Sequence, residues 1–185
     1  MPKLLIIIIL FLFFGANSIA QNIYPTHIDK LYGFIDKSGR QILAPTYQKA
    51  FVSQGGMARI QKDGKYGFVN EQGKLIIEAK YDKAYDFSDG LAAVSVEGKW
   101  AYVDNTGATK ISLSCNHAHA FSEGLARIQT GTSVSFIDKT GKTVITGAFT
   151  NAGDFNDGLA KVQQNKKWGF IDKSGKFAVP VKYDA

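Results

Sequence analysis

The sequence predicts an all-β protein in which tandem 34-residue units, each a β-hairpin or three-strand repeat, stack as an open elongated array or solenoid. Three observations support this prediction. The string LYGFIDKSGR at residues 31–40 returns almost unchanged within KKWGFIDKSGK at residues 166–176. Three further copies lie between them at a constant spacing of 34 residues, without insertion or deletion. The strings are short, aromatic and β-branched, and glycine separates them, which is typical of strands joined by turns.

Residues 1–20 precede the repeats and have the features of a secretory signal peptide. Lys3 stands before an apolar run over residues 4–14, and Ser18 and Ala20 occupy the two small-residue positions that signal peptidase reads. The run is shorter than the roughly 20 residues that span a bilayer. We therefore expect cleavage near Ala20-Gln21 and a periplasmic, extracellular or cell-surface protein; a retained signal-anchor is the alternative. Residues 21–31 then form an N-terminal lead-in, and residues 32–185 form the repeat domain.

Composition narrows the possible classes of protein. The chain has 22 lysines and arginines against 16 acidic residues, and loss of Lys3 with the signal leaves a net charge of +5. Cys115 is the only cysteine, so packing rather than an internal disulfide must stabilise the fold. Despite the positive charge, we do not expect an exported protein to bind nucleic acid.

The repeated motif begins at residues 32, 66, 100, 134 and 168, and its columns suggest structural roles. The first column is mostly aromatic: Tyr32, Tyr66, Trp100, Val134 and Trp168. The second column is entirely aromatic and is expected to form the spine of the core: Phe34, Phe68, Tyr102, Phe136 and Phe170. Two turn columns follow, one of Asp36, Asn70, Asp104, Asp138 and Asp172, and one of Gly39, Gly73, Gly107, Gly141 and Gly175.

The turn columns have a direct physical reason. An Asp or Asn side chain accepts hydrogen bonds from the backbone N–H groups just after it, which favours a type I turn. The glycine then adopts the left-handed conformation that closes a hairpin with a bulge, and a Cβ there would cost roughly 1 kcal/mol. A residue present in every copy is structural by default, so we assign no catalytic or calcium-binding role to the Asp column.

A second block, of the form GLAxV, precedes four of the five motif copies. It occupies residues 55–60, 89–94, 123–128 and 157–162, and its repeated alanines are Ala58, Ala92, Ala126 and Ala160. Alternation within a strand turns Ala160 and Val162 to one face and Lys161 to the other. Each unit is therefore expected to contain a GLAxV strand, an aromatic strand and a third short strand such as residues 74–77.

Two alternatives compete with an open β array. Tetratricopeptide helix pairs share the 34-residue period, but short β-branched strings with frequent glycine do not form helices. A closed propeller-like ring would pair the first and last units. Neither end supplies the GLAxV strand that Tyr32 lacks, so we favour the open array.

The string KKWGFIDKSGK, with DFNDGLAKV upstream and VPVKYDA downstream, resembles the WG-repeat family of bacterial proteins, also called KWG repeats. Five copies of the motif cover residues 32–185. Trp-Gly itself occurs only at Trp168-Gly169, whereas two copies have Tyr-Gly and the others have Trp100-Ala101 and Val134-Ser135. The resemblance implies an exported or surface-associated binding or scaffolding module, and it brings no catalytic residues.

Cys115, His117 and His119 form an asymmetric cluster within SCNHAHAF at residues 114–121. Alternation would place all three on one face of a strand, where two of them could bind zinc or copper with a further ligand. The three residues span roughly 13 Å along a strand, too far for all to meet one ion. In the repeat, Cys115 takes a half-buried aromatic slot and His117 a solvent position. We therefore predict no metal site and no cofactor, and keep these residues as the alternative.

The function we expect is protein interaction or scaffolding at the cell envelope, through the extended face that repeats create. A glycan- or cell-wall-binding module is the alternative, in which exposed Tyr and Trp and ladders of basic residues contact the ligand. The ladders are Lys37, Lys139 and Lys173; Lys65, Lys99 and Lys167; and Arg40, Lys74, Lys142 and Lys176. The specific protein or glycan partner and the oligomeric state do not follow from the sequence.

Burial of the first aromatic column would distinguish these two functions. A row of solvent-exposed Tyr and Trp side chains would favour glycan binding, and their burial would favour the scaffold. We do not expect an enzyme, because the chain shows no asymmetric set of base, acid and nucleophile. The repeat is least regular between Trp100 and Val134, so a specific site, if the protein has one, is expected in that region.

Overall fold

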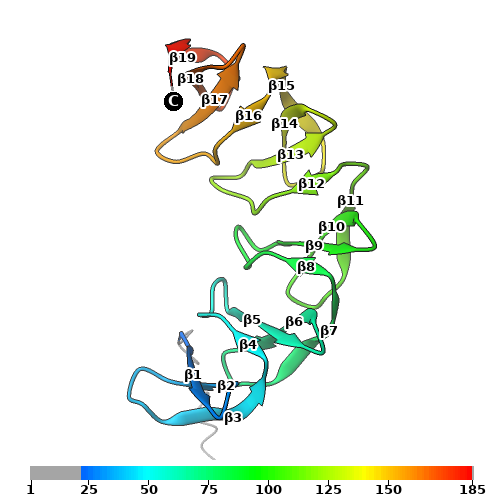
Figure 1. Ribbon diagram of the computed structural model, residues 1–185, viewed down its shortest axis with the longest axis vertical. Helices are drawn as coiled ribbons and strands as arrows, with labels where there is room; N and C mark the ends of the chain where they lie inside the picture. Colours follow the sequence, from blue (N-terminus) through cyan, green and yellow to red (C-terminus); the bar gives the residue numbers. More distant parts are fainter. Residues whose placement is uncertain (1–21, 185) are drawn as a thin grey trace, which may run out of the picture.

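The computed structural model describes residues 22–184, and all of its regular elements are β-strands. Five small antiparallel sheets follow one another along a curved row, with the first and last sheets at opposite ends of the molecule (Figure 1). This arrangement confirms the predicted all-β tandem array, and the described residues adopt its open form rather than the closed ring. The expected signal peptide, residues 1–20, and its cleavage site lie outside the described residues.

Each sheet is a meander in which every strand pairs with its neighbour in sequence. Sheet 1 contains β1 (Tyr24–Ile28), β2 (Leu31–Ile35) and β3 (Gln41–Tyr47). Sheet 2 contains β4 (Lys49–Ala50), β5 (Met57–Lys62), β6 (Lys65–Asn70) and β7 (Leu75–Tyr81). Sheet 3 contains β8 (Lys83–Ala84), β9 (Ala92–Val96), β10 (Lys99–Val103) and β11 (Thr109–Ser112). Sheet 4 contains β12 (His117–Ala118), β13 (Ala126–Thr130), β14 (Ser133–Ile137) and β15 (Thr143–Phe149). Sheet 5 contains β16 (Asn151–Ala152), β17 (Leu159–Gln164), β18 (Lys167–Asp172) and β19 (Phe177–Tyr183).

Two kinds of strand are absent from the sequence prediction. Strands β4, β8, β12 and β16 have two residues each, too few to show a period of two, and each adds a fourth strand beside the GLAxV strand. Strand β1 lies in the N-terminal lead-in and takes the place of a GLAxV strand. Tyr24 pairs with Ile35 as Ala58 pairs with Val69. The expectation that neither end supplies this strand is therefore wrong, because backbone pairing does not require the GLAxV side chains.

The core lies between the sheets, with one hydrophobic layer at each of the four junctions. At the junction of sheets 2 and 3, Phe68 shares a layer with Ala92 and Val94. The small alanines of the GLAxV strands allow neighbouring sheets to approach closely. Sheets 2, 3 and 4 therefore each bury one face against the sheet before them and the other against the sheet after them, whereas sheets 1 and 5 each bury one face against a single described neighbour.

The aromatic column largely fills these layers, as expected. Its fully buried members are Phe34, Phe68, Tyr102 and Phe136. Phe170 departs from the expectation, since it is 37% exposed on sheet 5, where no further described sheet covers its face. A second buried aromatic column, which the sequence analysis overlooked, consists of Phe87, Phe121 and Phe155. Phe68 and Phe87 meet edge to face, with ring centroids 4.9 Å apart.

The turns after the aromatic strands have the expected chemistry. Oδ1 of Asp104 accepts hydrogen bonds from the Thr106 hydroxyl at 2.6 Å and from the backbone N–H groups of Thr106 and Ala108 at 2.9 and 3.1 Å. These bonds, chiefly the one from the hydroxyl, lower the pKa of Asp104 because they favour the carboxylate. Gly107 has a φ of 86°, in the left-handed region where a side chain would be strained.

Candidate functional site

In a regular unit, the glycine of the Trp-Gly or Tyr-Gly pair makes room for the strand that follows the aromatic strand. We call this last strand of each sheet (β3, β7, β11, β15 or β19) the third strand of the unit. A Cβ built on Gly67 would lie 2.5 Å from the carbonyl oxygen of Ile77 and 2.7 Å from the backbone nitrogen of Ala79. Strand β7 bulges at this point of its pairing with β6. Sheets 1 and 5 show the same close approach at Gly33 and Gly169. In these three sheets the glycine therefore leaves room for backbone atoms of the neighbouring strand.

Sheets 3 and 4 lack this glycine and accommodate its absence differently. In sheet 4, Ser135 takes its place, and β15 still keeps seven residues and the bulge. A Cβ on Gly147 of this strand would lie 2.5 Å from the ring of Phe149. In sheet 3, Ala101 takes its place, and Leu113 stands at the column of Gly147. Strand β11 has four residues, and Ala101 pairs directly with Ser112. Strand β11 therefore lacks the bulge that the last strands of the other sheets make beside this position.

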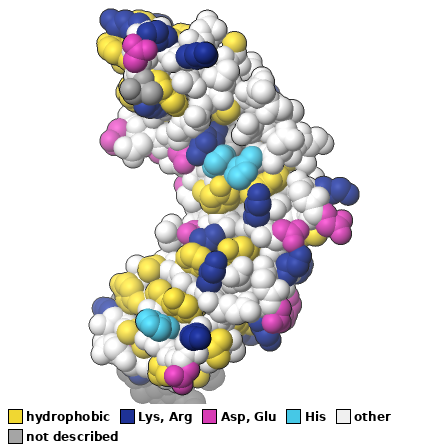
Figure 2. Space-filling model, viewed as in Figure 1, with side chains coloured by type: hydrophobic (Ala, Val, Ile, Leu, Met, Phe, Trp, Pro, Cys, Tyr) yellow, Lys and Arg dark blue, Asp and Glu magenta, His cyan; other side chains and the backbone are white. Residues whose placement is uncertain are grey.

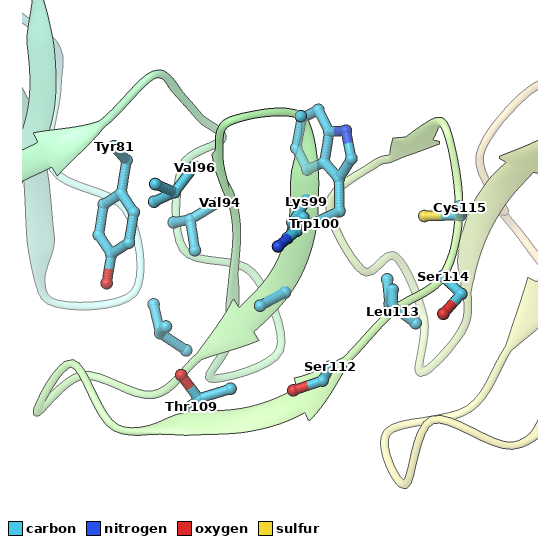
Figure 3. A pocket seen from close by; sticks show the side chains of 13 residues that line it. Tyr81, Val94, Val96, Lys99, Trp100, Thr109, Ser112, Leu113, Ser114 and Cys115 are labelled. Carbon is cyan, nitrogen blue, oxygen red and sulfur yellow. The ribbon is translucent and has the colours of Figure 1, made fainter.

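The altered edge of sheet 3 borders a pocket of about 500 Å³ between the end of β7 and sheet 3 (Figure 3). Tyr81 and Val94 line one side of the view, and Leu113 and Cys115 line the other. Cys115 occupies a column in which the other sheets have an aromatic residue, so a small side chain stands where a ring would fill space. Burial raises the pKa of its thiol. Two departures from the repeat therefore meet in this pocket.

A second feature, the aromatic–histidine cluster, consists of Tyr85, Trp100, His117 and His119. The ring centroids of Trp100 and His117 are 4.6 Å apart, those of His117 and His119 4.4 Å, and those of Tyr85 and His119 5.5 Å. The Tyr85 hydroxyl and Nε2 of His117 share a hydrogen bond of 2.8 Å. Nε1 of Trp100 donates to the carbonyl oxygen of Asn116 at 3.1 Å. These contacts join sheet 3 to the first strand of sheet 4.

The environment of the cluster keeps its histidines neutral at neutral pH. Burial lowers the pKa of His119 to about 4, and the charges of Arg127 and His117 act in the same direction. Burial also lowers the pKa of His117, with help from Lys83 and Arg127. Neutral rings can stack on aromatic neighbours without the cost of burying a charge.

Two arginines extend the cluster along the molecule. The guanidinium of Arg59 lies 3.9 Å over the ring of Phe51, and Arg59 forms an ion pair with Asp86 at 3.0 Å. Arg127 forms an ion pair with Asp154 at 2.7 Å. We call the combined surface the aromatic–arginine strip, and its members are Phe51, Arg59, Tyr66, Tyr85, Trp100, His117, His119 and Arg127. Figure 2 shows hydrophobic, basic and histidine side chains gathered near the middle of one face.

Two hollows lie along the strip. The larger, of about 270 Å³, has Arg59, Tyr66 and Tyr85 in its lining. The smaller, of about 170 Å³, has His119 and Arg127 in its lining. Both are smaller than the clefts that usually hold drug-sized ligands, and they suit single side chains of a partner better.

The structure separates the three candidate metal ligands. The rings of His117 and His119 lie together in the strip, whereas Cys115 lines the pocket at the edge of sheet 3. Within residues 22–184, no group of three or more His, Cys, Asp and Glu side chains is arranged to hold a metal ion. The alternation along the strand thus brings two of the three residues together.

The first aromatic column is not exposed in a row. Trp100 is 3% exposed, and Tyr32, Tyr66 and Trp168 are half-buried. The basic ladders lie at the surface, but several members already have acidic partners, and these pairs are Arg40–Asp36, Lys65–Asp82, Lys167–Asp184 and Lys173–Glu123. The described surface therefore presents neither a row of flat aromatic platforms nor a continuous ladder of unpaired basic residues.

Sequence reasoning pointed to the region from Trp100 to Val134, and His117 and His119 lie there. It did not identify Tyr85 as a site residue. Arg59 and Arg127 occupy the column of Lys161, for which strand alternation predicted only an outward-facing side chain. The sequence signal that could have identified them was their outward position in a strand that pairs with the strand carrying the aromatic column.

Comparison with protein families decides the relationship of this chain. The family described as "WG containing repeat" matches in five tandem stretches, residues 32–66, 66–100, 100–131, 135–168 and 168–185. The chain belongs to the WG-repeat family. A search of curated proteins finds no match for this WG-repeat protein.

Solved structures share the fold of this WG-repeat protein at low sequence identity. A eukaryotic initiation factor matches with a TM-score of 0.61 and 10% identity, over 88% of this chain and 52% of its own. Hsv2p of Kluyveromyces lactis matches with a TM-score of 0.53 and 12% identity, over 82% of this chain and 58% of its own. PorZ, a bacterial surface component of the type-IX secretion system of Porphyromonas gingivalis, matches with a TM-score of 0.50 and 11% identity, over 91% of this chain and 27% of its own.

These neighbours are β-propeller-like and repeat proteins, and the likeness concerns the fold alone. The chain spans less than two thirds of the length of each of them. The part of the chain that the structure describes contains no helix with the length and hydropathy needed to cross a bilayer.

Proposed function

We propose that this WG-repeat protein is an exported scaffold that binds a protein partner of the cell envelope through the aromatic–arginine strip, and that it is not an enzyme. The observation that carries the proposal is the composition of the strip, in which half-buried Tyr and Arg side chains lie together on one face around the buried Trp100. These residue types dominate the binding energy of protein interfaces.

Several side chains of the strip are already held in place by their neighbours, which supports this role. Arg59 is stacked on Phe51 and paired with Asp86, and Arg127 is paired with Asp154. Side chains that are already held lose less conformational entropy when a partner binds. The two hollows then provide places for anchor side chains of the partner.

The first aromatic column is buried at Trp100 and half-buried at Tyr32, Tyr66 and Trp168, which weighs against the glycan alternative. Sugar rings stack on accessible aromatic faces, and Trp100 offers 3% of its surface to solvent. The scaffold reading also suits an extended repeat surface, along which several sheets can contact one partner.

A pull-down from an envelope fraction tests the proposal, with the chain lacking residues 1–20 as bait. We expect a defined protein to be captured and the double variant Arg59→Ala/Tyr85→Ala to lose at least tenfold of that capture. The matched control is Lys74→Ala/Lys142→Ala, which removes two exposed turn lysines and should capture as the wild type does. Equal loss in both variants, or no loss in either, would contradict the role of the strip.

A glycan array run beside the pull-down distinguishes the two functions. Binding to an envelope glycan without capture of a protein would replace the scaffold with the glycan-binding alternative. Mass spectrometry of the exported protein tests the export step, and a mature N-terminus at Gln21 is the expected result. Retention of residues 1–20 would support the signal-anchor instead.

A further inference from the structure

The pocket at the edge of sheet 3 gathers a third departure from the repeat, which concerns charge. In sheets 2 and 5, a lysine that begins the aromatic strand pairs with an aspartate 17 residues later, as Lys65 does with Asp82 and Lys167 with Asp184. In sheet 3 the corresponding residues are Lys99 and Asn116. Within the described residues no ion pair joins Lys99 to a carboxylate. Its positive charge therefore stays uncompensated.

Asn116 makes the same hydrogen bond to the backbone as the aspartate, but it carries no negative charge. Oδ1 of Asn116 accepts a hydrogen bond from the backbone N–H of Gly131 at 2.6 Å, as Oδ2 of Asp82 does from the N–H of Glu97 at 2.7 Å. The loop geometry is thus satisfied in both sheets. What differs is a negative charge next to the lysine, which sheet 3 lacks.

Lys99 lines the same pocket as Ala101 and Cys115, the other two departures from the repeat. The pocket also includes apolar groups of Val94, Val103 and Leu113, and the hydroxyls of Ser112 and Ser114. Figure 3 shows the Lys99 nitrogen between Val94 on one side and Leu113 on the other in that view. An apolar cavity of about 500 Å³ with a few polar groups at its wall is the usual form of a small-molecule site.

We propose that this pocket binds a small carboxylate with an aromatic or branched apolar body, and that Lys99 pairs with the carboxylate. The apolar body fits the space beside Ala101 and Cys115, where the regular units place the third strand and an aromatic ring. The hydroxyls of Ser112 and Ser114 can donate further hydrogen bonds to the carboxylate oxygens. This site is separate from the aromatic–arginine strip and does not depend on the proposed scaffold function.

Calorimetric titration of the chain lacking residues 1–20 tests the site with a defined panel of probes. The panel is 4-phenylbutyrate, indole-3-acetate, isovalerate and the neutral isostere 4-phenylbutan-1-ol. We expect at least one carboxylate to bind, with 4-phenylbutyrate about fivefold tighter than its alcohol, because a partly exposed ion pair adds modest affinity.

Variants with matched controls assign the binding to this pocket. Lys99→Met should reduce the affinity for 4-phenylbutyrate to that for the alcohol, whereas Lys65→Met, the equivalent position in sheet 2, should leave it unchanged. Cys115→Tyr restores the aromatic residue of the repeat and should abolish binding. Val96→Trp fills the pocket from a position that is 43% exposed, so it tests the same space without altering the core.

Three results would overturn the proposal. The first is the absence of binding by every carboxylate of the panel at about 1 mM. The second is equal binding of 4-phenylbutyrate and its alcohol by the wild type. The third is unchanged binding in Val96→Trp, which would place the ligand elsewhere on the protein.

Discussion

Sheets 2 and 3 have the same strand order and the same hairpin pairing, yet the large pocket is lined mainly by residues of sheet 3, and sheet 2 contributes Tyr81 at the end of β7. Phe68 and Tyr102, at equivalent positions, are both fully buried. The sheets differ at the third strand, which has seven residues in β7 and four in β11. The substitutions that accompany this difference are Gly67 to Ala101, Tyr81 to Cys115 and Asp82 to Asn116.

The comparison teaches where a stacked repeat tolerates change. The second aromatic column, which is fully buried between the sheets at Phe34, Phe68, Tyr102 and Phe136, keeps its size, because a change there would leave a cavity or a clash in a packed layer. The third strand lies at the free edge of each sheet, so its backbone can shift without disturbing two neighbours. A binding site can therefore arise at the edge of one unit while the array stays intact.

The largest expected effect tests whether the two sheets share the same core. Phe68→Ala and Tyr102→Ala should each lower the free energy of unfolding by about 3–5 kcal/mol, because each removes a fully buried ring. Phe170→Ala, at the exposed end of the column, should cost about 1 kcal/mol. Urea denaturation followed by tryptophan fluorescence measures these changes. A cost for Tyr102→Ala close to that for Phe170→Ala would break the comparison.

The next effect concerns the glycine that separates the two sheets. Gly67→Ala should cost about 3 kcal/mol, because its Cβ would meet backbone atoms of β7 that cannot move away alone. Ala101→Gly should cost less than about 1 kcal/mol, since it relieves no clash and adds backbone freedom to the unfolded chain. Equal costs at the two positions would show that the short β11 has another cause than the Cβ of Ala101.

A pH dependence follows from the junction of sheets 3 and 4, which carries His119 where the previous junction carries Tyr85. The pKa of His119 is about 4, below its ordinary value of 6.5. Between these two values the unfolded chain binds more protons than the folded one, so stability falls as the pH is lowered from 6.5 to 4. The loss should be about 2 kcal/mol for this partly buried group. His119→Gln should flatten the profile, while His27→Gln, an exposed histidine in β1, should not.

The smallest effect concerns the lysines that begin the aromatic strands. Lys65→Met removes an exposed ion pair with Asp82 and should cost at most about 0.5 kcal/mol. Lys99→Met removes no ion pair and should leave the melting temperature unchanged. Scanning calorimetry at low and high salt measures both. A clear loss of stability in Lys99→Met would mean that Lys99 has a structural role. The charge difference between the two sheets would then no longer indicate a ligand site.

The sequence by itself determined the all-β class, the 34-residue unit, the turns and most of the buried aromatic column. These features are local or repeat at a fixed spacing, so strand alternation and turn chemistry are readable in the chain. The two-residue strands and β1 are too short or too irregular to show a pattern, and backbone pairing with a neighbouring strand decides them.

Only the tertiary structure decided the candidate sites. The close approach at Gly67 is set by a bulge in another strand, and the sequence shows that glycine only as part of a motif. Cys115, His117 and His119 looked like one cluster because they alternate along the chain. Stacking of the sheets placed the histidines beside Tyr85 and Trp100, and the shifted edge of sheet 3 placed Cys115 in the pocket. Contacts between units depend on where the third strand of each unit lies, and no single column of the repeat specifies that position.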